Sequence, residues 1–245
     1  MSDRPALRRR AGLGFRRAAD RYLAVIVLLF ASMLTMALVG DSDVGRGVSL
    51  AVLALTLLVT FRTSEWRPRS LAIVAMVVAS AVFVAVVLAI VGAGQAGRAV
   101  AATVGVCLVV AAVAAIVRRL AAHPEISFKT VMGALCIYLY FVLFFAQLFM
   151  LVDALTSGPF FAQTDDPQSV DFIYFSMVTL TTVGYGDFTS VVEVGRILAG
   201  IEALSGQLYL VSVVALLVGN IGGKLRRPGA TADEGGAPPE EPRDR

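Results

Sequence analysis

Long runs of apolar residues restrict the fold of this chain more than any other feature. Hydrophobic residues make up 58% of the sequence and charged residues only 16%. A helix satisfies its own backbone hydrogen bonds and can therefore cross lipid, which takes about 20 apolar residues. We expect such a helix in each of six runs: residues 22–39, 44–61, 70–91, 99–117, 128–152 and 191–221. The sequence thus predicts an all-α membrane protein with six transmembrane helices.

The first apolar run has two interpretations. It follows an arginine-rich arm, residues 1–21, and this order is also found in secretory signal peptides, with a candidate cleavage site at residues 37–40. The run is longer than the apolar region of most signal peptides, and further spans follow it. We therefore expect a retained first transmembrane helix.

A short motif, Thr-Thr-Val-Gly-Tyr-Gly-Asp, stands between the last two runs at residues 181–187. An extended chain alternates the direction of its carbonyl groups. Aiming successive carbonyls at one axis requires positive φ at some positions, which glycine adopts without steric cost. Gly184 and Gly186 alternate with larger residues in this way, and a row of such carbonyls can replace the water shell of K⁺. An ordinary glycine-rich turn is the alternative.

We expect the motif to act as an ion filter and call it the filter segment. Its predicted K⁺-binding residues are Thr182, Val183, Gly184, Tyr185 and Gly186. The carbonyls from Thr182 to Tyr185 would line the ion path, and the Thr182 hydroxyl would add an oxygen at the inner end. Since one chain offers one loop, four chains are needed to surround an ion, which predicts a four-fold symmetric homotetramer.

The apolar run before the filter segment is too short to cross a bilayer. We expect a helix over residues 167–181, with Asp166 as its cap and Pro167 in its first turn. A helix of this length re-enters the membrane, and the partial negative charge at its carbonyl end favours a cation in the membrane centre. The sequence therefore predicts a re-entrant pore helix below the filter.

From Thr182 to Asp187 the chain resembles the potassium channel signature. Residues 128–223 are similar to the pore domain of prokaryotic tetrameric potassium channels, and the four preceding spans to the six-helix layout of the voltage-gated-like superfamily. The resemblance implies a hydrogen bond between Tyr174 and Asp187 behind the filter, and it assigns a supporting role to Thr181 as well. Val178 stands where some relatives carry a glutamate, so filter inactivation through a carboxylate at that position is not expected.

Basic residues are distributed unevenly between the spans. One side of the membrane would hold the arginine-rich arm together with Arg62, Arg67, Arg69, Arg118, Arg119, Lys129, Lys224, Arg226 and Arg227. By the positive-inside rule this side is cytoplasmic. We therefore expect a multi-pass protein of the plasma membrane with both termini in the cytoplasm and the filter facing outward. Because the charges lie between spans and form no single basic face, nucleic acid is not an expected partner; the lipid bilayer is.

The chain divides into four expected regions: a basic arm (1–21), a four-helix bundle (22–120), the pore domain (121–223) and a disordered tail (224–245). Voltage sensing requires several charges inside a moving helix, since one charge crossing the field contributes roughly 2.3 kcal/mol per 100 mV. The fourth run, 99–117, contains no arginine. We expect weak or absent voltage gating.

Two residues of the last run are gating candidates. Gly206 lies near the middle of the run, where relatives commonly have a hinge glycine; close helix packing is the alternative. Glu202 lies one turn earlier, and a carboxyl group inside a membrane is a functional hypothesis by default. The alternative is a structural acid, paired with Gln207 or with a hydroxyl of the pore helix.

These features together predict a potassium-selective channel that conducts K⁺ passively. The alternatives are a weakly selective cation channel and an auxiliary or structural subunit of a hetero-oligomeric channel. A secondary transporter would show internal repeats and paired broken helices, and the sequence has a single filter segment. We expect no enzymatic activity and no cofactor, with K⁺ as the permeant ion, because the sequence carries no metal cluster, phosphate loop or nucleophile motif.

Overall fold

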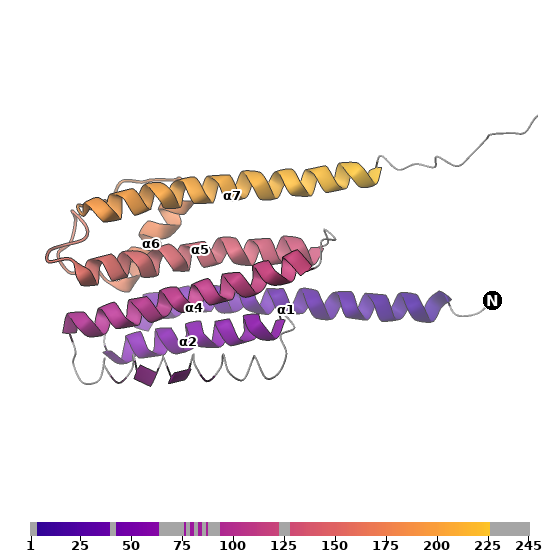
Figure 1. The fold of residues 1–245 in the computed structure, drawn as a ribbon, viewed down its shortest axis with the longest axis horizontal. Helices are drawn as coiled ribbons and strands as arrows, with labels where there is room; N and C mark the ends of the chain where they lie inside the picture. Colours follow the sequence, from indigo (N-terminus) through magenta and orange to yellow (C-terminus); the bar gives the residue numbers. More distant parts are fainter. Residues whose placement is uncertain are drawn as a thin grey trace, which may run out of the picture.

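The computed structural model describes residues 4–39, 43–63, 76, 79–80, 83–84, 87, 94–122 and 128–225. Its helices are drawn in Figure 1 and are, in chain order, α1 (Arg4–Val39), α2 (Asp43–Thr63), α4 (Gly94–Ala122), α5 (Phe128–Leu155), α6 (Ser169–Leu180) and α7 (Glu193–Leu225). The third expected span, residues 70–91, lies outside the described residues apart from isolated positions. The described ranges contain no strand, only one isolated bridge between two loops.

Four helices are long and apolar enough to cross a membrane. Their apolar windows are Tyr22–Val39, Gly94–Ala122, Thr130–Leu155 and Glu193–Leu216. The apolar part of α2, Gly47–Thr63, is shorter, as is α6. These windows and the helical content confirm the expected all-α membrane protein.

The helices run past the ends of the expected spans, and the difference is largest for α1. α1 runs for 36 residues without a break, so the arginine-rich arm from Arg4 onward continues the first span as one helix. At the other end of the chain, α7 continues to Leu225, two residues past the expected end of the pore domain. The rest of the expected tail, residues 226–245, lies outside the described residues.

The expected cap of the pore helix is wrong. α6 begins at Ser169, and its N-cap is Gln168, whose backbone is extended with a ψ of 160°. The Gln168 backbone N–H donates to the Asp171 carboxylate at 2.8 Å. An acid three residues after the cap thus satisfies an N–H that the helix cannot, so Asp166 and Pro167 remain in the loop before the helix.

α1, α2, α4 and α5 lie side by side along most of their length (Figure 1), and their buried side chains form one core with α6. Hydroxyl groups join the helices inside this core. Ser32 of α1 and Thr56 of α2 are 3.1 Å apart at their hydroxyl oxygens, and Thr60 of α2 lies 2.8 Å from the Tyr140 hydroxyl of α5. The first helices therefore dock on the α5 helix of their own chain.

An aromatic cluster holds the start of α6. Phe161 is its centre, with ring centroids 4.8 Å from Phe160, 5.1 Å from Phe172 and 5.0 Å from Phe188. Phe149 of α5 joins the cluster through Phe160, at 5.7 Å. Rings at these separations and tilted angles pack favourably. The cluster therefore fixes the pore helix against α5 and against the chain that follows the filter.

Candidate functional site

The filter segment is tied to the last turn of α6 by backbone hydrogen bonds. The Val178 carbonyl accepts from the N–H of Val183 at 3.0 Å and of Gly184 at 3.3 Å, and the Thr182 N–H donates to the Thr179 carbonyl at 2.9 Å. The Thr181 hydroxyl donates to the Met177 carbonyl at 2.6 Å. Carbonyls that a helix end would leave without partners thus anchor the start of the filter.

The filter backbone alternates in the sign of φ. Thr182, Gly184 and Gly186 have φ of 57°, 56° and 81°, and the residues between them are not among those with positive φ. Alternation of this kind turns successive carbonyls toward one side of the chain. The positive φ expected of Gly184 and Gly186 is confirmed.

Thr182 was not expected in this conformation. A β-branched residue at positive φ is rare, and such backbone strain costs about 1 to 3 kcal/mol and is concentrated at functional sites. Its hydroxyl donates to the Thr181 carbonyl at 2.7 Å, which leaves the lone pairs of the hydroxyl oxygen available. Nothing in the residue type signals this angle. Its position, two residues before Gly184 in an alternating segment, was the one available sign.

The filter glycines are required by their backbone angles and not by crowding. A Cβ built on Gly184 or Gly186 would meet no atom of this chain within 4 Å. The side chains that alternate with them are also open, since Val183 is 52% exposed and Tyr185 71% exposed. One chain therefore forms the filter without covering it.

Tyr174 of α6 reaches past the filter segment to the residue that follows it. Its hydroxyl donates to the Asp187 carboxylate at 2.6 Å. The Tyr174 ring also packs against Phe188, with centroids 6.0 Å apart. The pore helix is therefore bonded to both ends of the filter segment, through Val178 at the start and through Tyr174 at the finish.

The loops on either side of the pore helix and filter pair with each other. The Ala162 N–H donates to the Thr189 carbonyl, and the Val191 N–H to the Phe160 carbonyl, both at 3.0 Å. The Gln163 side chain adds two bonds of 3.0 Å to Thr189. This pairing closes the loop that carries the filter and fixes where α7 begins.

Glu202 lies fully buried between α7 and the pore helix. Its Oε1 contacts the Ser176 hydroxyl of α6, and that hydroxyl also lies 2.9 Å from the Val142 carbonyl of α5. The second carboxyl oxygen is buried without a hydrogen-bond partner. Of the two expected partners, the structure selects a pore-helix hydroxyl; Gln207 is exposed.

Gly206, one turn after Glu202, faces the end of the pore helix. A Cβ at this position would meet the Leu180 carbonyl oxygen closer than real contacts allow, with the Leu180 Cδ1 at 2.9 Å. α7 therefore passes the last residue of α6 at a distance that only glycine permits. This contact favours close packing as the role of Gly206, while the hinge remains a hypothesis.

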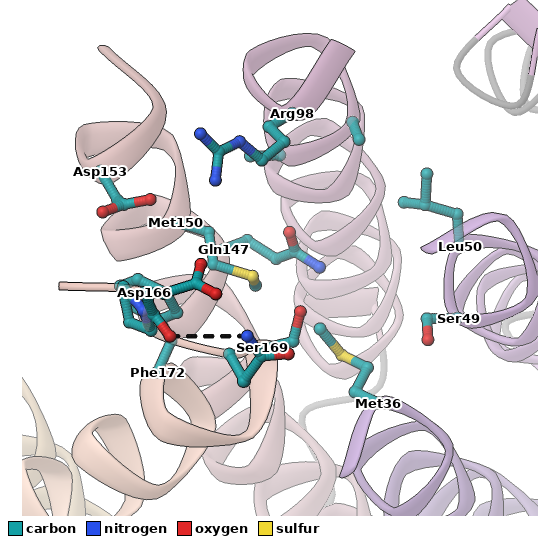
Figure 2. A pocket seen from close by; sticks show the side chains of 14 residues that line it. Met36, Ser49, Leu50, Arg98, Gln147, Met150, Asp153, Asp166, Ser169 and Phe172 are labelled. Atoms are coloured by element: carbon teal, nitrogen blue, oxygen red, sulfur yellow. Dashed lines mark hydrogen bonds between the residues drawn. The ribbon is translucent and has the colours of Figure 1, made fainter. Parts of the chain in front are cut away.

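A cavity of about 280 Å³ separates the first helices from the start of α6. Figure 2 shows Arg98 of α4 and Asp153 of α5 at one end of it, and Gln147 of α5 extending across it toward α4. Gln147 is only 4% exposed, and its side chain occupies the space beside Gly105, where a Cβ would lie 2.5 Å from its Cδ. The pair fixes how closely α4 approaches α5.

The part of the chain with this geometry also has counterparts among known proteins. Residues 134–221 match the ion channel family model. This ion channel segment includes most of α5, all of α6, the filter segment and most of α7. This segment is therefore similar to ion channels, which carry ions across membranes and are not enzymes.

Curated relatives are similar to about a third of the chain. Potassium voltage-gated channel subfamily A member 4 of Homo sapiens is 36% identical over 78 residues, 30% of this chain and 12% of that protein. Potassium voltage-gated channel protein shk-1 of Caenorhabditis elegans is 30% identical over 99 residues, 38% of this chain and 17% of that protein. Subfamily A member 10 of Gallus gallus is 36% identical over 78 residues, 15% of its length. The chain thus spans less than a fifth of each of these relatives.

Sequence reasoning missed residues whose partners are distant in the chain. Val142 completes the surroundings of Glu202 and carries no signal that marks it, whereas Ser176 was expected only as one of several hydroxyls of the pore helix. Gly195 is a further case, because a Cβ there would lie 2.7 Å from the Phe160 ring. The sequence indicated only that a glycine stands in an apolar helix, and this does not identify Phe160 as the residue that packs against it.

Proposed function

We propose that this chain assembles as a homotetramer that conducts K⁺ selectively. The observation that carries the proposal is the alternation of φ at Thr182, Gly184 and Gly186, which turns the intervening carbonyls toward one axis. Rings of such carbonyls replace the hydration shell of K⁺. The names of the curated potassium channels to which part of this chain is similar support this choice of ion. The ligands would be Thr182, Val183, Gly184, Tyr185 and Gly186, with K⁺ as cargo.

We propose four copies because a single chain covers only one side of its own filter segment. Val183 and Tyr185 are more than half exposed, and no atom of the chain lies near the faces of the filter glycines. A carbonyl row on one side of an ion supplies too few oxygens to compensate for its lost water. A ring of four identical loops supplies the rest.

α7 has a second surface that fits an assembly. Its exposed apolar residues recur at spacings of four and three, which places them in one stripe along the helix: Ile197, Ile201, Leu204, Leu208 and Val211. The buried side of α7, with Glu202 and Gly206, faces the pore helix of its own chain. The stripe is therefore available to a neighbouring subunit or to lipid.

The orientation in the membrane is proposed from charge. Basic residues gather at the ends of the spans that we assign to the cytoplasm, which would place both termini inside a cell and the filter outside at the plasma membrane. The interior of α4, between Arg98 and Arg118, has no arginine, so we propose weak or absent voltage gating. Transfer of several elementary charges per channel in a patch-clamp recording would contradict this.

Reconstitution tests the proposal directly. Purified chain in liposomes should pass K⁺ and not Na⁺, the flux should be blocked by Ba²⁺, and the purified particle should have the mass of four chains. Equal fluxes of K⁺ and Na⁺ would replace the proposal with a weakly selective cation channel. A monomer that carries no flux would support an auxiliary role.

A further inference from the structure

Three helices of the ion channel segment meet at one hydroxyl group. The Ser176 oxygen on α6 lies 2.9 Å from the Val142 carbonyl oxygen on α5 and in short contact with Oε1 of Glu202 on α7. Ser176 and Glu202 are both fully buried. No water from the surroundings can replace either bond, so the protons of these groups must account for both.

The number of protons available for these two hydrogen bonds determines whether Glu202 is protonated or ionised. A hydroxyl has one proton to donate, while a backbone carbonyl and an ionised carboxylate can only accept. If Glu202 were ionised, the two acceptors would compete for the one Ser176 proton and one contact would be repulsive. If Glu202 is protonated, its O–H donates to Ser176 and the Ser176 O–H donates to Val142, so both bonds form.

We propose that Glu202 is a proton-binding site that holds its proton at neutral pH and, through Ser176 and Val142, ties α7, α6 and α5 together behind the filter. The unpartnered Oε2 atom agrees with this, because a buried neutral carbonyl oxygen without a partner is far less costly than a buried charge. In the described part of the chain, Ser176 is the hydrogen-bond partner of the Glu202 carboxyl group, and no ion pair reaches that group.

In the described part of the packed helices, the other titratable groups do not offer a compensating charge. On α5, Tyr138 is half-buried and its ring stacks on that of Tyr209, with centroids 5.9 Å apart. On α6, Asp171 accepts from Gln168 and Tyr174 donates to Asp187. On α7, the Tyr209 hydroxyl donates to the Ala134 carbonyl. Each of these groups is neutral or bonded elsewhere, so the proton is what neutralises Glu202.

The site predicts a dependence of conduction on pH, and this step rests on the proposed channel function. As pH rises and the proton leaves, the ionised Glu202 carboxylate can only accept, and it competes with the Val142 carbonyl for the one hydrogen bond that Ser176 can donate. The hydrogen bond from Ser176 to Val142 is then weakened, and with it one of the contacts between α5 and the pore helix. Because α6 ends at the filter segment, we expect K⁺ flux to fall at alkaline pH and to be constant around neutral pH.

Infrared spectroscopy tests the proton without requiring conduction. At pH 7 the purified wild-type protein should show the carbonyl band of a protonated carboxyl group, and Glu202→Gln should lack it. Glu193→Gln removes an exposed carboxyl from the same helix and should retain the band. A wild-type spectrum without this band at pH 7 overturns the proposal, whether or not the variant assembles. So does a band that Glu202→Gln leaves unchanged.

Flux measurements test the coupling. An amide can donate to Ser176 as the protonated carboxyl does, so we expect Glu202→Gln to conduct within about twofold of wild type at neutral pH and to lose the alkaline decline. Glu193→Gln should keep that decline. A Glu202→Gln profile that declines like wild type would overturn the coupling. If the infrared band is present but neither the wild-type protein nor any variant conducts, the channel proposal fails and the proposal of a proton site stands.

Discussion

Gly206 of α7 lies against the carbonyl oxygen of Leu180, the last residue of the pore helix. The contact leaves no room for a Cβ, and the atom it would displace is backbone. We predict that Gly206→Ala moves the end of α6 and with it the filter, at a cost of about 1 to 3 kcal/mol for overpacking. Tetramer stability in detergent and the K⁺ to Na⁺ flux ratio should both fall.

Gly200 provides the matched control for this prediction. It lies in the same helix, but a Cβ there would meet nothing within 4 Å. Gly200→Ala should leave the stability of the subunit unchanged, because no atom of this chain would meet the added methyl group. If Gly206→Ala instead keeps full selectivity and alters only the open probability, Gly206 acts as a hinge and the packing interpretation is wrong.

Substitutions of a filter glycine can show whether the filter requires the positive φ or the absence of a side chain. Gly184 has a φ of 56° with no atom within 4 Å of an added Cβ. An L-alanine there should cost about 1 to 2 kcal/mol in backbone conformation and reduce K⁺ flux. D-alanine, introduced by semisynthesis, prefers positive φ and should preserve selective flux. Loss of selectivity with both enantiomers would show that side-chain volume, and not φ, sets the requirement.

The bond from Tyr174 to Asp187 should couple the pore helix to the outer end of the filter. Tyr174→Phe and Asp187→Asn each remove this bond, and we expect each to reduce steady K⁺ flux. Because they break the same interaction, the double variant should be no worse than the more damaging single variant. Asp165→Asn removes a comparable exposed charge without a bond to the filter and should leave the flux unchanged. Additive losses would mean that the two residues act independently.

The approach of α4 to α5 depends on Gly105 and Gln147. Gly105→Ala would bring a Cβ to 2.5 Å from the Gln147 Cδ, and we expect a loss of about 1 to 3 kcal/mol that lowers the melting temperature in detergent. Shortening the opposing side chain with Gln147→Ala in the same protein should restore part of the stability. A double variant that is less stable than Gly105→Ala alone would exclude this contact as the cause.

Several local features followed from the sequence because they depend on neighbouring residues only. The positive φ of Gly184 and Gly186 could be predicted, since glycine alone adopts that angle freely. The start of the pore helix was predicted two residues too early, because Asp171 offers a cap to Gln168 that competes with Asp166. Local signals therefore located the pore helix but not its first residue.

Residues far apart in the chain could not be paired by the same reasoning. The sequence suggested a pore-helix hydroxyl as a partner for Glu202, and the structure selects Ser176. It offered no sign that Val142 of α5 would meet the same hydroxyl, because that contact depends on the crossing of two helices. The docking of the first helices on α5, through Thr60 and Tyr140, was undetermined for the same reason.

The sequence by itself determined that this chain is a helical membrane protein with one filter segment, because apolar length and the spacing of glycines act locally. The tertiary structure decided that Thr182 joins the glycines at positive φ, that Glu202 meets the Ser176 hydroxyl, and that Gly206 packs against the last residue of the pore helix. The last two contacts arise where α6 and α7 come within contact distance, and no short stretch of sequence contains both partners.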